Sequence, residues 1–118
     1  MNEEIKERWL AALRSGEYKQ GRSILYNRED NTFCCLGVLC DLAVKEGIVT
    51  TIVGTTEDIV DCTFFGMEKA YEYLPEEVME WANLSDNAPF VGIYTLTELN
   101  DDFKMSFENI ADRIEKHL

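Results

Sequence analysis

Cysteine is the residue type in this chain with the widest chemical repertoire, and three of its four cysteines lie in the segment "CCLGVLC", residues 34–40. A zinc site needs about four Cys, His or carboxylate ligands that converge on one point, usually as paired CxxC or HxxxH units. Cys34 and Cys35 are adjacent, so on a helix their side chains would point about 100° apart. His117 is the single histidine. We therefore expect no metal and no other cofactor.

A reactive thiol is the second chemistry that these cysteines could supply, and it requires a base or a positively charged environment. Cys34 and Cys35 are expected at a helix N-terminus, which lowers the pKa of a thiol and makes both candidates for ligand contacts. Only His117 could serve as a base. The alternative is that a free cysteine behaves as a small buried hydrophobe. We expect this for Cys40 and for one of the adjacent pair.

Positive charge is concentrated near the N-terminus of an acidic chain. The net charge is -12, yet residues 1–28 hold six basic and four acidic residues, a local net charge of +2. An anionic ligand would therefore bind most readily here. The candidates to bind phosphate and orient the ligand are Arg14, Tyr18, Lys19, Gln20 and Arg22. The alternative is an ordinary solvated loop. The acidic remainder repels nucleic acid and anionic membranes, so we expect no direct binding to either.

Other polar and aromatic residues could complete a nucleotide site. Asn100 and Asp101 could bind ribose hydroxyls or base edges, and Phe90 or Tyr94 could stack on a base. Backbone amides at the start of the helix that follows Cys34 could add to a phosphate site. The alternative for Asn100 and Asp101 is a turn between two helices, where both residue types are favoured.

Helices are predicted at five places. Residues 3–14 are amphipathic, with Asn2 as a cap, and Cys34–Glu46 is apolar almost all round and ends at Gly47. The other three are expected in "LPEEVMEWANL", in "TLTELNDD" with a capping box from Thr95 to Glu98, and in "SFENIADRIEKHL" capped by Ser106. Short strands are expected at Ser23–Tyr26, at 48–53 and within "CTFFGMEKAYEY".

The pattern predicts an α+β fold in one domain, residues 1–118, with about four helices packed on a small sheet of two to four strands. The start, "MNEEIKER", has no apolar stretch of a secretory signal, and no apolar run approaches the length of a membrane span. Cysteines in such a chain are expected as free cytosolic thiols without disulfides.

The order of four segments resembles a widespread family of small phage-encoded proteins. These segments are "RWLAALRSGEYKQGR", "FCCLGVLCDLA", "LPEEVMEWANL" and "LTELNDDFKMSFENIADRIEKHL". Family members often have a glycine shortly after the Asn-Asp pair, where this chain has Phe103 or Lys104. The resemblance implies a role in phage biology, in the cytoplasm of the bacterial host, without implying a mechanism.

Two functions from different classes fit these observations. The first is sequestration of a nucleotide-derived immune signal, such as a cyclic ADP-ribose isomer or a cyclic oligonucleotide, by a homo-oligomer whose ligand site lies between protomers. The second is an acidic inhibitor that binds a host defence protein, with mimicry of DNA as one way to do so. The net charge of -14 over residues 29–118 favours the second, although acidity also serves solubility. An enzyme is the third possibility, because no paired acid and base is evident. The remaining alternative is a structural or regulatory phage protein that binds no small ligand. We favour sequestration.

Overall fold

The N-terminal helix packs against two other helices in the structure, a computed structural model that describes all residues 1–118. α1 (Glu3–Arg14) lies against α2 (Cys35–Lys45) and α4 (Phe107–His117). Asn2 accepts a hydrogen bond from the Ile5 N–H at 3.0 Å, which confirms the predicted cap. Trp9 is fully buried, and its indole N–H donates to the Cys35 C=O at 3.0 Å, tying α1 to the start of α2.

The second helix, α2, is buried on most sides, as its sequence predicts. Cys34 is its N-cap, and the Cys34 sulfur accepts from the Gly37 N–H at 3.4 Å. A Cβ atom built on Gly37 would lie 1.7 Å from the Leu25 C=O oxygen, so only glycine allows the chain to pass this closely. After the last turn, Gly47 adopts φ +76°, and the Ile48 N–H donates back to the Ala43 C=O. This is the expected left-handed helix end.

The strands form three separate two-stranded antiparallel ribbons and not one sheet. β1 (Tyr26–Asn27) pairs with β2 (Thr32–Phe33), β3 (Thr51–Gly54) with β4 (Cys62–Phe65), and β5 (Phe90–Val91) with β6 (Tyr94–Thr95). The α+β class is therefore confirmed, but the single sheet under the helices was a wrong expectation. β3 begins three residues later than predicted because Ile48 still closes the end of α2.

The remaining helices begin at or close to their predicted starts. α3 (Glu76–Ala82) starts one residue after Pro75, which is its N-cap. Thr95 and Glu98 exchange hydrogen bonds, so the capping box forms ahead of a π-helical turn, η1 (Glu98–Asp102). Ser106 caps α4 by accepting from Asn109. Between η1 and α4, Lys104 adopts φ +52°, a conformation that favours glycine. This accounts for the glycine that family members often have near this position.

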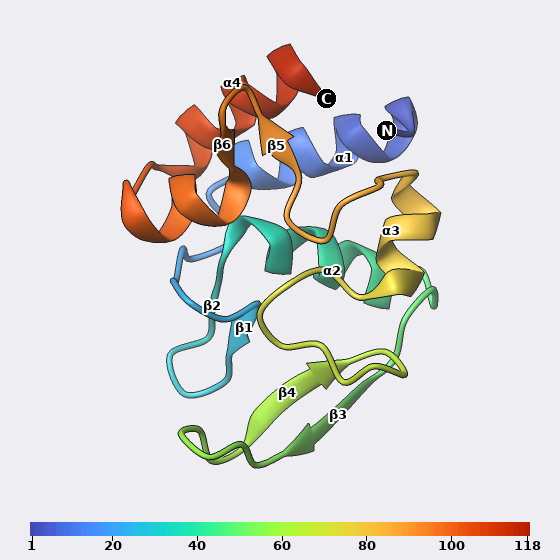
Figure 1. Cartoon of the computed structure of the whole chain (residues 1–118), viewed down its shortest axis with the longest axis vertical. Coiled ribbons are helices and arrows are strands. Elements are labelled where there is room, and N and C mark those ends of the chain that lie inside the picture. The colour runs from blue at the N-terminus through green and yellow to red at the C-terminus, as the bar shows by residue number, and fades with distance from the viewer.

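Figure 1 shows how these elements are layered. α1, α4, β5 and β6 lie at one end of the molecule, α2 crosses the middle, and β3 and β4 form the opposite end. The radius of gyration is 13.1 Å, which matches the value of about 13 Å for one compact domain of this length. None of the helices combines the length and the apolar composition that crossing a bilayer requires.

Candidate functional site

Asn100 lies at the centre of a buried hydrogen-bond network. It is 0% exposed, and its Oδ1 accepts from Gln20 Nε2 at 2.9 Å and from the Cys35 N–H at 3.2 Å. Its Nδ2 donates to the Gly21 C=O and to Asp101 Oδ1, both at 2.9 Å. One amide thus joins the 20–21 loop, the start of α2 and η1. Because both ends of the amide are already bonded, we leave Asn100 out of the candidate site.

The basic loop is held in place by the same network. Gln20 Nε2 also donates to the Met105 C=O at 2.8 Å, and Asp101 accepts from the Ser23 N–H at 3.1 Å. The Gly21 N–H donates to Phe33 of β2, and the Phe33 N–H donates to Lys19, so the loop runs beside β2 like an added parallel strand. Gln20 and Asp101 therefore position the loop, while Lys19 and Arg22 are exposed.

Tyr18 belongs to a separate cluster on the surface of α2. Its hydroxyl donates to Asp41 Oδ2 at 2.5 Å, and Lys45 Nζ lies 3.1 Å from the Tyr18 oxygen and 3.2 Å from Asp41. Partial burial and the Asp41 carboxylate raise the pKa of Tyr18. The hydrogen bonds to Tyr18 and Asp41 raise the pKa of Lys45. The hydroxyl therefore stays protonated and bonded at neutral pH, which suits anchoring of the loop.

Three other predicted residues lie away from the loop. Arg14 pairs with Asp112 at 2.8 Å and Glu115 at 3.2 Å, so its charge links α1 to α4. Phe90 and Tyr94 lie on β5 and β6, at the end of the molecule opposite β3 and β4 (Figure 1). Tyr94 packs edge-on against Phe103 with ring centroids 4.7 Å apart. The predicted residues therefore do not converge on one point.

The expected lowering of the thiol pKa of Cys34 and Cys35 was wrong. Both cysteines are buried, and burial raises the pKa of Cys34 to about 11 although the Gly37 and Leu36 N–H groups lower it. Burial also raises the pKa of Cys35 and Cys40 well above the usual value. Loss of solvation raises the thiol pKa by more than the helix N-terminus lowers it. Cys40 is fully buried, as predicted, and all four cysteines are free thiols.

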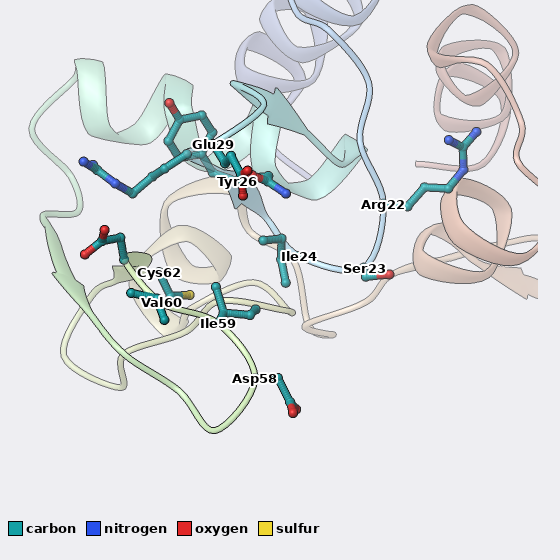
Figure 2. Close-up of a pocket in the computed structure, with 12 residues that line it drawn as sticks. Arg22, Ser23, Ile24, Tyr26, Glu29, Asp58, Ile59, Val60 and Cys62 are labelled. Atoms are coloured by element: carbon teal, nitrogen blue, oxygen red, sulfur yellow. The ribbon is translucent and has the colours of Figure 1, made fainter.

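A cavity of about 500 Å³ lies between the segment that leads into the β1–β2 hairpin and the turn that leads into β4. This volume falls within the range of small-molecule sites. Figure 2 shows Ile24 on one wall, Ile59, Val60 and Cys62 on the other, and Arg22 at the rim with its guanidinium turned away from them. The polar lining residues are Arg22, Ser23, Tyr26, Asn27, Arg28, Glu29, Asp58 and Asp61.

The charges of this cavity are divided between its two walls. The 22–29 wall carries Arg22 and Arg28, and neither forms an ion pair within the protein, unlike Arg14. The 58–62 wall carries the Asp58 and Asp61 carboxylates. Glu29 adds a third carboxylate to the arginine wall. The cavity can thus present hydrogen-bond donors and acceptors to one ligand from opposite sides.

Sequence analysis found only Arg22 among the residues that line this cavity. Arg28 belongs to the same basic N-terminal stretch, and that charge asymmetry was the signal that could have added it to the candidates. Asp58 and Asp61 lie in the acidic cluster "TTEDIVD", thirty or more residues after Arg28 along the chain. Only the fold brings that cluster opposite the arginines. No group of His, Cys, Asp or Glu side chains is arranged to hold a metal ion.

Comparison with known proteins identifies one family. The model of a family described as a domain of unknown function, DUF8296, matches residues 1–118. No curated protein and no solved structure matches the chain.

Proposed function

The chain belongs to the DUF8296 family, and we propose that it binds and sequesters a nucleotide-derived signalling molecule without converting it. The ligand site is the cavity between residues 22–29 and residues 58–62. The observation that carries this proposal is a cavity of about 500 Å³ whose lining includes Arg22 and Arg28, two arginines without internal ion-pair partners, together with the carboxylates of Asp58 and Asp61. The cellular role is that of a phage accessory protein that counters bacterial immunity.

The division of charge suits the parts of a nucleotide. Phosphate oxygens accept charge-assisted hydrogen bonds from guanidinium groups, which are the stronger kind. Ribose hydroxyls donate to carboxylates such as those of Asp58 and Asp61, the contact that ribose-binding acidic residues make in dinucleotide sites. Ile24 and Val60 supply an apolar surface for a base. A ligand that carried only phosphates would be repelled by the carboxylate wall, so the site selects for a nucleoside part.

Sequestration, and not catalysis, is supported by the state of the nucleophiles. The only thiol that lines the cavity is Cys62, and burial raises its pKa. A thiol that stays protonated is a poor nucleophile. No histidine lines the cavity, so a general base with a pKa near neutrality is missing there.

The test is a capture-and-release experiment. The purified protein is incubated with cyclic ADP-ribose isomers and with cyclic oligonucleotides, free ligand is removed by filtration, and the protein is heat-denatured. We expect one compound to be depleted and then released intact, as measured by chromatography and mass spectrometry. Release of an altered compound would mean that the protein is an enzyme. No depletion of any compound would contradict sequestration.

Charge reversal tests the position of the site. Each hydrogen bond to a charged group contributes about 1.5–3 kcal/mol, so Arg28→Glu should weaken binding of the captured compound at least about tenfold in calorimetric titration. Arg22→Glu should act in the same direction from the rim. Lys19→Glu is the matched control, because it changes the net charge equally on an exposed residue outside the cavity. Equal losses for all three variants would show a diffuse charge effect and refute this site.

An acidic inhibitor of a host protein is the second candidate, and one observation favours it. Three of the eleven basic residues form ion pairs, Arg8 with Glu46, Arg14 with Asp112 and Glu115, and Lys45 with Asp41, so eight basic residues remain against nineteen acidic ones. The surface that a partner would meet is correspondingly acidic. Under this function Arg28→Glu should leave inhibition in infected cells intact, whereas under sequestration the same variant should lose it.

A further inference from the structure

β3 is the outermost strand of its ribbon. β4 lies between β3 and β1, and β3 forms the free lower edge of the molecule in Figure 1. Thr51, Ile52 and Val53 are all exposed, whereas Cys62, Thr63 and Phe65 on β4 are buried. An exposed strand edge with apolar side chains is a template for pairing with another strand.

The backbone of β3 has hydrogen-bonding groups that point away from β4. The Gly66 N–H donates to the Thr50 C=O at 2.9 Å, so these two residues form a hydrogen-bonded pair. Such pairs alternate along an antiparallel ladder, and the register places Ile52 opposite Phe64 as the next one. Thr51 and Val53 therefore direct their N–H and C=O groups outward, and no other segment of the chain bonds to them.

The charge along this edge differs from that of the rest of the chain. The nine residues from Ile48 to Thr56, "IVTTIVGTT", carry no charge, although the chain as a whole has a net charge of -12. Glu46 precedes this run and Glu57 follows it. Ile52 is 52% exposed and Val53 is 49% exposed. Two such acidic molecules can approach without direct repulsion at this edge.

We infer that β3 pairs with β3 of a second copy, antiparallel about a twofold axis at Ile52. Outward-pointing residues must pair with outward-pointing residues, so Thr51 of one copy exchanges N–H···O=C hydrogen bonds with Val53 of the other. Ile52 then lies opposite Ile52 of the second copy, in a non-hydrogen-bonded pair where side chains are closest. The two ribbons join into one continuous sheet. This inference is independent of the ligand site.

A twofold axis at Ile52 keeps charged residues out of the paired strands and places the exposed Ile52 side chains together. Ile52 is the midpoint of the uncharged run, so every cross-strand pair from Ile48 to Thr56 joins two uncharged residues. Like charges directly opposite each other destabilise a strand pair. Moving the register by several residues in either direction would bring Glu46 or Glu57 against its own copy. An isologous pair of this kind is the commonest symmetry of homo-oligomers.

The first test measures the mass of the wild-type protein and its variants by sedimentation equilibrium. We expect a dimer for wild type, and a dimer dissociation constant at least about a hundredfold higher for Ile52→Lys or Ile52→Glu alone, since each places like charges across the axis. An equimolar mixture of the two variants should dimerise again. Ile93→Lys is the matched control, because Ile93 is 81% exposed and lies between β5 and β6, outside both β3 and the cavity. It should remain dimeric.

The second test fixes the register by disulfide formation. All four native cysteines are buried, so an introduced surface thiol is the only one free to cross-link. Ile52→Cys should form a cross-linked dimer in mild oxidant much faster than Val53→Cys, because only position 52 faces itself in a close pair. A wild-type monomer at all concentrations, a mixture of Lys and Glu variants that stays monomeric, or faster cross-linking through position 53 would overturn the inference.

Discussion

The hydrogen-bond network around Asn100 and the β3–β4 hairpin differ in how a buried polar side chain is bonded. In the first, a fully buried amide has all its bonds made, to Gln20, Gly21, Cys35 and Asp101. In the second, the hydroxyl of Thr63 is buried with no hydrogen-bond partner, while Ile52 and its neighbours on β3 lie exposed.

This difference shows which region holds the fold together and which is available for partners. Removing a bonding group from a satisfied network leaves several buried polar groups unpaired, which costs more than any single hydrogen bond contributes. The hairpin has no buried residue on β3 and keeps unused backbone donors and acceptors at its edge. Elements of this kind open at lower free energy than the core and supply binding surfaces.

The largest effect is expected for Asn100→Leu. The substitution strips the Gln20 amide, the Gly21 C=O and the Cys35 N–H of a partner, and each unpaired buried group costs about 1–3 kcal/mol. We expect the free energy of unfolding to fall by about 3–5 kcal/mol, measured by urea denaturation. A loss below about 1 kcal/mol would show that the network does not stabilise the fold.

A smaller effect is expected from pH. The pKa of Cys34 is about 11 in the folded protein, above its usual value of 9.0, so below pH 9 the thiol is protonated in both states. As pH rises from 9 towards 11, the Cys34 thiol ionises first in the unfolded chain, so the free energy of unfolding falls. One pKa unit corresponds to about 1.4 kcal/mol, so Cys34 alone should lower the free energy of unfolding by about 2 kcal/mol between pH 8 and 10.5. Cys35 and Cys40 act in the same direction.

The control for this pH dependence compares the two regions directly. Urea denaturation at both pH values should show a flatter pH dependence for Cys34→Ala, on the buried helix, than for Cys62→Ala, on the hairpin. Identical slopes for wild type and Cys34→Ala would rule out this thiol as the source of the alkaline loss.

The smallest effect has the opposite sign and concerns the hairpin. Thr63→Val removes a buried hydroxyl that has no partner and keeps the shape of the side chain. We expect the thermal unfolding midpoint to rise, with a gain of about 1 kcal/mol, since an unsatisfied buried group destabilises by at least that amount. Destabilisation instead would mean that the hydroxyl makes a bond in solution, and the contrast with Asn100 would disappear.

Local signals in the sequence predict much of the secondary structure. Asn2, Ser106 and the Thr95–Glu98 pair act as caps because their short polar side chains bond the backbone nearby, whatever the rest of the chain does. Predictions failed where contacts with a distant segment set the local structure. Strand 48–53 shifted to 51–54 because the end of α2 uses Ile48, and the expected single sheet became three ribbons.

Prediction of the candidate site meets the same limit, because it too depends on contacts with distant segments. Residue types and charge asymmetry selected Arg22, which lines the cavity, but they also selected Gln20, Asn100 and Asp101, whose polar groups bond within the protein. A polar residue near a turn has the same sequence signature in both cases. Whether it meets solvent or another segment depends on contacts across eighty residues, such as that between Gln20 and Asn100.

By itself the sequence determined the helices, the α+β class, the burial of Cys40 and the uncharged run from Ile48 to Thr56, because these depend on local periodicity, caps and composition. Only the tertiary structure decided the rest. It raised the pKa of the Cys34 thiol that a helix N-terminus alone would lower, because burial removes water more strongly than backbone N–H groups replace it. It also brought residues 58–62 and residues 22–29 together around one cavity and placed β3 at the outer edge, since both depend on how segments far apart in the chain pack together.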